Sequence, residues 1–153
     1  MAGTFSQIYI QIVFAVKGRD SLISDSWEEE LFKYITGIVT NKGQKLLAIN
    51  GMPDHIHLLV GIKPSCSSSD LVREIKKSTN EWINAKAFTK SKFQWQEGFG
   101  AFSYSHSGLS NVIAYIQNQK EHHRKKSFRE EYKEFLSHFQ IDHKDEYLFE
   151  WIE

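Results

Sequence analysis

Pro53-Asp54-His55-Ile56-His57-Leu58-Leu59-Val60-Gly61 is the stretch that decides the fold. Its apolar run, bounded by a proline and a glycine, predicts a short buried strand. Because side chains alternate across a strand, His55 and His57 share one face and the isoleucine between them points to the other. Two imidazoles on one rigid face are typical of half a metal site or of a pair of phosphate contacts. The simpler alternative is that both histidines are half-buried and hydrogen-bonded to the backbone.

The segments around this strand alternate between strand and helix patterns. Residues 4–16 and 45–50 are rich in strand formers, and the second of these should pair antiparallel with the histidine strand. Between them, Ser24, Asp25 and Ser26 offer caps for a helix, and Ser26 with Glu29 fits a capping box. A second helix is predicted over residues 70–87, with a further strand after it.

This order of elements, β-α-β-β-α-β, is that of a ferredoxin-like or RRM-like α+β fold, an antiparallel sheet with helices on one face. After Gly108, the apolar spacing predicts a C-terminal helix that carries Tyr115 and Gln119 one turn apart. A last helix is expected over about 127–139, and the apolar tail at 147–151 should pack on the body or on a partner. The fold serves many functions and selects none of them.

Composition describes one globular domain, which we expect to span residues 1–153. The chain is 41% hydrophobic and has zero net charge, which excludes a uniformly basic nucleic-acid coat protein and restricts any DNA contact to local patches. The single cysteine excludes a disulfide framework. The N-terminus lacks a signal-peptide pattern and no apolar run is long enough to cross a bilayer, so we expect a cytoplasmic protein without a membrane partner.

In this order along the chain, the pieces resemble the single-tyrosine HUH transposases, which include small insertion-sequence transposases and their REP-associated relatives. The resemblance covers nearly the whole chain, and its matching pieces are residues 12–17, 53–59, 95–104 and 114–119. It implies an enzyme that cuts single-stranded DNA beside a hairpin, forms a 5′-phosphotyrosine and later reverses that bond.

The resemblance also implies roles for particular residues. Tyr115 would be the nucleophile, and His55, His57 and Gln119 would hold a divalent metal ion, Mg²⁺ or Mn²⁺. It implies a homodimer whose active sites are shared between subunits. From charge and position, the residues expected to contact DNA are Lys17, Arg19, Arg73, Lys76, Lys77 and Arg124.

Three alternatives bear on this interpretation. A histidine-triad nucleotide hydrolase would require a histidine at position 59, where this chain has Leu59. A non-catalytic protein that binds single-stranded nucleic acid through its sheet and aromatic side chains is the main alternative function. Among the six tyrosines, Tyr104 is the rival nucleophile, because it ends a predicted strand beside a glycine-rich loop.

Overall fold

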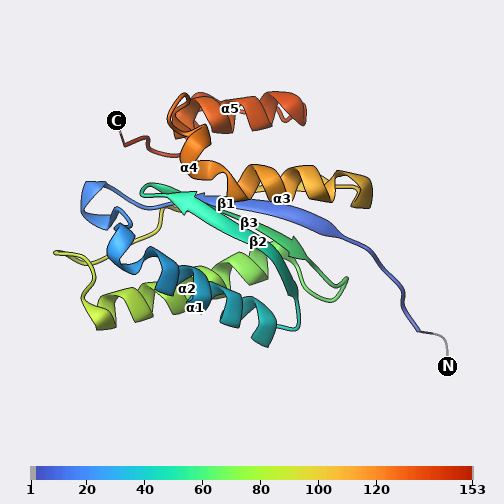
Figure 1. Ribbon diagram of the computed structural model, residues 1–153, viewed down its shortest axis with the longest axis horizontal. Helices are drawn as coiled ribbons and strands as arrows, with labels where there is room; N and C mark the ends of the chain where they lie inside the picture. The colour runs from blue at the N-terminus through green and yellow to red at the C-terminus, as the bar shows by residue number, and fades with distance from the viewer. Residues whose placement is uncertain (1–2, 153) are drawn as a thin grey trace.

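A computed structural model describes residues 3–152 of the chain. Its strands are β1 (Tyr9–Ala15), β2 (Lys45–Met52), β3 (His55–Gly61) and β4 (Gly100–Tyr104). They form one antiparallel sheet in the order β4-β1-β3-β2 (Figure 1). Since one helix follows β1 and another follows β3, this is the ferredoxin-like arrangement, and the predicted α+β fold is confirmed.

Two long helices, α1 (Asp25–Asn41) and α2 (Ser68–Lys86), cover one face of the sheet (Figure 1). Leu31 of α1 and Ile75 of α2 are fully buried there, together with Phe14 of β1. This packing forms the largest of the three apolar clusters and removes the apolar side of each helix from water.

Ser24, the first of the three candidate caps, is the N-cap of α1. Its backbone is extended and its hydroxyl accepts a hydrogen bond of 3.3 Å from the Ser26 backbone N–H. The expected capping box of Ser26 and Glu29 is wrong, because Ser26 is already within the helix. Glu29 Oε1 instead forms an ion pair with Lys33 Nζ, one turn further along the helix, at 3.5 Å.

Three further helices cover the opposite face: α3 (Leu109–Gln117), α4 (Gln119–His122) and α5 (Phe128–His138). The sheet is therefore covered on both faces, where the sequence had suggested helices on one (Figure 1). Val13 and Ala15 of β1 point to this second face and are buried there.

The apolar tail packs on the body of the same chain. Phe149 and Trp151 contact Phe128 of α5, with ring centroids 5.7 and 5.4 Å apart. Gln96 binds the tail backbone twice, because its Nε2 donates to the Glu150 carbonyl oxygen and its Oε1 accepts from the Glu150 N–H, each at 2.7 Å. The prediction that the tail packs on the body of the chain is thus confirmed.

Three short 3-10 turns complete the described part: η1 (Arg19–Ser21), η2 (His106–Gly108) and η3 (Asp145–Tyr147). Among the helices in residues 3–152, none combines the length and the apolar character needed to cross a membrane.

Candidate functional site

The two histidines lie at the start of β3 and face the second helical layer. Register places His55 opposite Ala15 and His57 opposite Val13, and both rings are fully buried. Their ring centroids are 5.0 Å apart, so the predicted shared face is confirmed. Gly51 of β2 permits the tight hairpin before them, because a Cβ there would clash with the His55 carbonyl oxygen.

Asp54, in the turn before β3, fixes the ring of His55. Its Oδ1 lies 2.6 Å from His55 Nδ1, so this nitrogen donates to the carboxylate and Nε2 is turned toward the site. Burial alone would lower the pKa of His55, but hydrogen bonds to Asp54 and Glu131 raise it above its ordinary value. A carboxylate behind an imidazole is the usual support of a metal-binding histidine.

Gln11 of β1 supports His57 in a different way. Gln11 Nε2 lies 2.9 Å from His57 Nδ1, and Gln11 Oε1 accepts a hydrogen bond of 2.9 Å from the Tyr104 hydroxyl. Burial lowers the pKa of His57 despite the attraction of Glu131, so the neutral ring is favoured. If the Gln11 amide turns over, Nδ1 becomes the donor and Nε2 is left with a free lone pair. The orientation of the Gln11 amide can thus set the tautomer of His57 and the nitrogen that is free to bind a cation.

One carboxylate oxygen of α5 meets three imidazoles. Glu131 Oε1 lies 3.0 Å from His57 Nε2, 3.2 Å from His123 Nε2 and 3.3 Å from His55 Nε2. Burial alone would raise the pKa of Glu131, but His57, His123 and His55 hold it well below its usual range. The carboxylate is therefore ionised at the centre of the histidine cluster.

The second carboxylate oxygen of Glu131 contacts Tyr115, the tyrosine expected to be the nucleophile. Glu131 Oε2 accepts a hydrogen bond from the Tyr115 hydroxyl and another, of 3.2 Å, from Gln119 Nε2. Burial, followed by the Glu131 charge, raises the pKa of Tyr115 far above its ordinary value. In this arrangement Tyr115 is protonated and aimed at the same carboxylate that the histidines contact.

The predicted pairing of Tyr115 and Gln119 holds although the helix is interrupted between them. α3 ends at Gln117 and α4 begins at Gln119, with Asn118 between the two. Asn50 Nδ2 donates to the Gln117 carbonyl oxygen at 3.1 Å, and this bond ties the end of α3 to β2. The Lys120 ammonium donates to the Gly51 carbonyl oxygen and holds α4 on the hairpin before the histidines.

The cluster fits a divalent cation. Potential ligand atoms of His55, His57, His123 and Glu131 all lie within 4.8 Å of one another. Within residues 3–152, Gln119 Oε1 is buried without a hydrogen-bond partner. His55 Nε2 and His123 Nε2 are buried with only Glu131 Oε1 near them, at 3.3 and 3.2 Å and outside hydrogen-bond geometry, so all three atoms can serve as ligands. Imidazole and carboxylate ligands together suit a transition metal such as Mn²⁺.

Two members of the cluster, His123 and Glu131, were not identified from the sequence. The sequence does contain a signal that Glu131 is buried, because this residue lies three residues after Phe128 and four before Phe135, within the apolar stripe of its helix. A charged residue in such a stripe indicates a buried partner. His123 lies one turn after Gln119, but it stands in a basic segment that predicts only a solvated surface.

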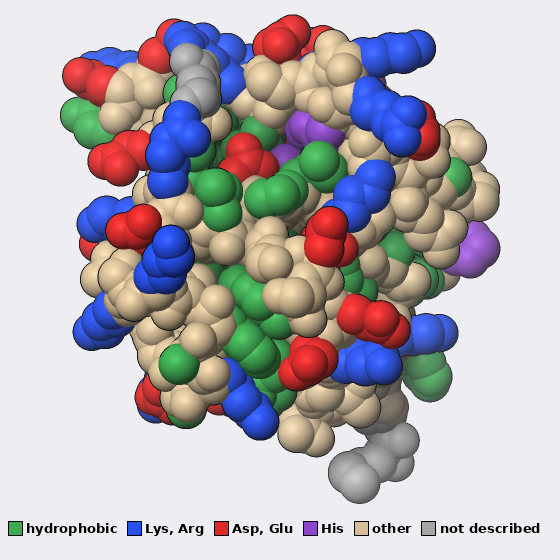
Figure 2. Space-filling view, turned by 60° about the vertical axis from the view of Figure 1, so that its left-hand side comes forward, with side chains coloured by type: hydrophobic (Ala, Val, Ile, Leu, Met, Phe, Trp, Pro, Cys, Tyr) green, Lys and Arg blue, Asp and Glu red, His purple; other side chains and the backbone are tan. Residues whose placement is uncertain are grey.

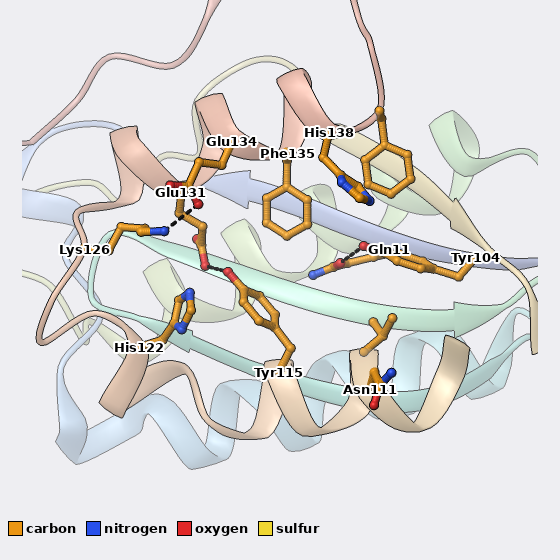
Figure 3. Close-up of a pocket in the computed structure, with 12 residues that line it drawn as sticks. Gln11, Tyr104, Asn111, Tyr115, His122, Lys126, Glu131, Glu134, Phe135 and His138 are labelled. Carbon is orange, nitrogen blue, oxygen red and sulfur yellow. Dashed lines mark hydrogen bonds and ion pairs between the residues drawn. The ribbon is translucent and has the colours of Figure 1, made fainter. Parts of the chain in front are cut away.

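Tyr115 borders a hollow of about 460 Å³ between α3 and α5. Figure 3 shows Tyr115 reaching up from α3 toward Glu131, with Phe135 beside them, while Tyr104 and Gln11 lie further along the same hollow. Burial raises the pKa of Tyr104 to about 12. The Tyr104 hydroxyl is held by Gln11 rather than by the carboxylate, so the geometry favours Tyr115 over its rival.

The histidine cluster also borders a second hollow, of about 350 Å³. His123, Asp54 and Arg19 are among its lining residues. Figure 2 shows histidine side chains set back in a depression, with hydrophobic and acidic side chains directly beside them and lysine and arginine side chains further out. The cluster therefore lies between two openings, one on the tyrosine side and one on the arginine side.

The six cationic residues expected to bind DNA divide into three groups. Two are exposed and form ion pairs within a single helical turn, Arg73 with Asp70 and Arg124 with Glu121. Arg19 lines the second hollow. The remaining three line one shared hollow elsewhere, and they are Lys17, Lys76 and Lys77.

A ferredoxin-like sheet with a buried histidine pair, a tyrosine and a glutamine from the following helices defines the class of tyrosine transposases. The model of the IS200-like transposase family matches residues 4–119, so this chain belongs to that family and to the proteins of DNA transposition. The match ends at Gln119, and His123 and Glu131 lie beyond it.

Individual relatives agree with this assignment. The chain is 23% identical over 124 residues to the ISDra2 transposase TnpA of Deinococcus radiodurans, a match that covers 78% of this chain and 89% of that protein. A crystal structure of a candidate transposase from Deinococcus radiodurans R1 superposes with a TM-score of 0.62 at 24% identity, covering 78% of this chain and 95% of the other. A REP-associated tyrosine transposase bound to a REP hairpin superposes with a TM-score of 0.55 at 17% identity, covering 77% and 72%. At these identities, the two structures show a shared fold.

Proposed function

We propose that this chain cuts and rejoins single-stranded DNA at hairpin-marked ends through a 5′-phosphotyrosine intermediate on Tyr115. The observation that carries the proposal is that a tyrosine hydroxyl and a buried histidine pair meet at one carboxylate, Glu131. A relative with this fold is bound to a REP hairpin, which supports a hairpin-bearing substrate. We further propose that residues 1–153 form a single transposase domain that acts in the cytoplasm.

In the proposed reaction, the Tyr115 oxygen attacks the scissile phosphorus, and the bond from phosphorus to the 3′ oxygen breaks. The tyrosine proton passes to Glu131 Oε2, the oxygen that already accepts its hydrogen bond. The departing 3′ oxygen takes up a proton from water and becomes a free hydroxyl. A 3′ hydroxyl later attacks the phosphotyrosine and restores a phosphodiester, so no external energy source is required.

The proposed metal ion is Mg²⁺ or Mn²⁺, held by His55 and His57 with Gln119 as the third ligand of the family pattern. His123 and Glu131 are candidates for further ligands, because they contribute to the same cluster. When bound, a divalent cation would draw charge from the phosphate oxygens and favour ionisation of the tyrosine. The buried oxygen of Gln119, which lacks a hydrogen-bond partner, supports its inclusion.

The support of His57 leads to a prediction about Gln11. Gln11→Leu should weaken Mn²⁺ binding roughly 10- to 100-fold, because the His57 ring loses the partner that sets its tautomer. Binding is measured by titrating the protein with Mn²⁺ and following free Mn²⁺ by electron paramagnetic resonance. Tyr104→Phe, which frees the Gln11 amide but leaves it in place, should have the smaller effect. If wild type and Gln11→Leu bind Mn²⁺ with equal affinity, Gln11 does not set the tautomer of His57.

The function itself is tested by incubating the protein with a single-stranded hairpin oligonucleotide and Mn²⁺. We expect a covalent adduct that survives denaturing electrophoresis and does not form when a chelator is present. The alternative, a non-catalytic binder of single-stranded nucleic acid, would shift the DNA on a native gel and yield no adduct under either condition.

Oligomeric state is a separate prediction. The resemblance implies a homodimer, for which light scattering should give about twice the 17.8 kDa mass of the chain. A tyrosine from the partner is not needed to complete the site, because Tyr115 lies beside the His57 of its own chain, with ring centroids 6.0 Å apart. We therefore propose that each chain uses its own tyrosine, in place of the shared sites that the resemblance implies.

Mixing two inactive variants tests this proposal. Tyr115→Phe keeps the histidines and His57→Ala keeps the tyrosine, so a mixed dimer has one working site only if subunits exchange their tyrosine helices. We expect the mixture to stay inactive in the adduct assay. Recovery of adduct on mixing would show that the sites are shared.

A further inference from the structure

A lysine-rich hollow lies away from the histidine cluster, between the end of β1, the middle of α2 and the segment before β4. Its volume is about 440 Å³, the size of a pocket for a small ligand. One carboxylate, Glu97, faces its positive charges. The lysines that line it are Lys17, Lys76, Lys77 and Lys92.

Lys76 has a structural role that the other lysines do not share. Its ammonium donates to the Gln96 carbonyl oxygen at 2.8 Å and to the Gly98 carbonyl oxygen at 2.7 Å. Burial lowers the pKa of Lys76 to about 8. Lys76 therefore holds the segment before β4 against α2 and forms a wall of the hollow.

The other three cations have no role within the fold. Lys17, Lys77 and Lys92 are exposed, and none of their ammonium groups has a hydrogen bond or an ion pair to any residue in the range 3–152. Together with Lys76, these three cations face a single carboxylate, Glu97, so the positive charge is in excess and its convergence costs free energy unless an anion binds. Asn80 adds an amide without a hydrogen bond, and its buried oxygen has no partner. An amide of this kind can bond to the edge of a base.

The position of this hollow connects it to the histidine cluster. Lys17 follows β1 two residues after Ala15, whose partner across the sheet is His55. Arg19, two residues further on, lines the hollow that contains His123. The residue between them, Gly18, has a φ of 80°, and the space where its Cβ would be is open. A strand could pass from one hollow to the other over Gly18 without meeting a side chain there.

We propose that the lysine hollow binds single-stranded DNA that continues from the scissile phosphate. The residues proposed to contact this strand are Lys17, Lys77, Lys92 and Asn80, and the lysines would bind its phosphate backbone. This inference rests on the proposed function and adds the path of the strand. Lysine contacts to phosphates are independent of sequence, and Asn80 supplies one contact to a base. A hollow of about 440 Å³ admits part of a single strand and is too small for a duplex, so we expect the hairpin to bind elsewhere.

The test measures binding of two DNAs by fluorescence anisotropy over a range of salt concentrations. One DNA is the hairpin with its single-stranded extension, and the other is the hairpin alone. The variant replaces all three exposed lysines with glutamine. A matched control replaces three other exposed lysines at the opposite edge and opposite end of the sheet: Lys42, Lys45 and Lys63.

For the extended hairpin, the variant should bind at least roughly tenfold more weakly, and the slope of log affinity against log salt should fall by about 2, or about 0.7 for each lost contact to a single strand. The hairpin alone should bind the variant and the wild type equally, and the control should resemble the wild type. An unchanged slope with the extended DNA, or an equal loss with the hairpin alone, would overturn the inference.

The adduct assay on the same wild-type preparation separates this inference from the proposed function. If wild type forms the adduct and the variant keeps its slope, only the lysine hollow is wrongly assigned. If wild type forms no adduct but the variant loses binding to the extended DNA, the hollow binds single strands and the proposed chemistry fails.

Discussion

Tyr115→Phe is expected to abolish the covalent protein–DNA adduct while hairpin binding stays close to that of the wild type. The substitution removes only the oxygen that would attack the phosphorus and leaves the ring on α3. The hydroxyl bonds to the ionised Glu131 carboxylate, so its loss should cost about 2 kcal/mol of unfolding free energy, as for other hydrogen bonds to charged groups. Denaturing electrophoresis with labelled DNA measures the adduct, and chemical denaturation measures the stability.

Tyr104→Phe is the matched control for this substitution. It also removes one phenolic oxygen at the same hollow, and that oxygen bonds to Gln11 instead of Glu131. We expect this variant to form the adduct, at a reduced rate if Gln11 is released. An adduct that persists in Tyr115→Phe and disappears in Tyr104→Phe would transfer the role of nucleophile to Tyr104.

His57→Ala should abolish cleavage and lower Mn²⁺ affinity by more than the 10- to 100-fold typical of losing a supporting residue. The ring is fully buried and its Nε2 lies 3.0 Å from Glu131 Oε1, so its removal opens the centre of the cluster. Hairpin binding should remain, because the proposed contacts to DNA lie on other elements. Mn²⁺ titration by electron paramagnetic resonance and anisotropy with the hairpin measure the two properties separately.

Loss of a buried ring could also unfold the chain, so a second variant is needed. His57→Asn keeps a polar side chain near Glu131 and should fold while losing metal affinity to a similar extent. His143→Ala removes an exposed histidine and should match the wild type in both assays. Wild-type Mn²⁺ affinity in a folded His57 variant would exclude this histidine as a ligand.

Much of the fold could be predicted because local sequence patterns specify its strands and helices. The apolar run at 12–16 has no polar alternation, and such a strand is covered on both faces. The polar alternation of residues 7–12 favours a single covered face instead, so the second helical layer over β1 was not predicted. The sequence could not decide which residue caps α1, because three consecutive polar residues at 24–26 can all cap a helix.

The site could be predicted where its residues are close together in the sequence. His55 and His57 are two residues apart on a strand, and Tyr115 and Gln119 are one helical turn apart, so spacing alone brings each pair together. Glu131 reaches His57 across 74 residues, and this contact exists only because α5 folds back over the sheet. No spacing rule predicts that contact, and the family pattern ends before it.

The most direct test of the account is to locate the nucleotide on the trapped wild-type adduct by mass spectrometry. Trypsin alone cannot decide between the two tyrosines, because no lysine or arginine separates Tyr104 from Tyr115 in the segment 93–120. Fragmentation of that peptide must therefore resolve the residues between them. The account predicts a nucleotide attached to Tyr115 through its phenolic oxygen. A nucleotide on Tyr104, or on any other residue, would contradict it.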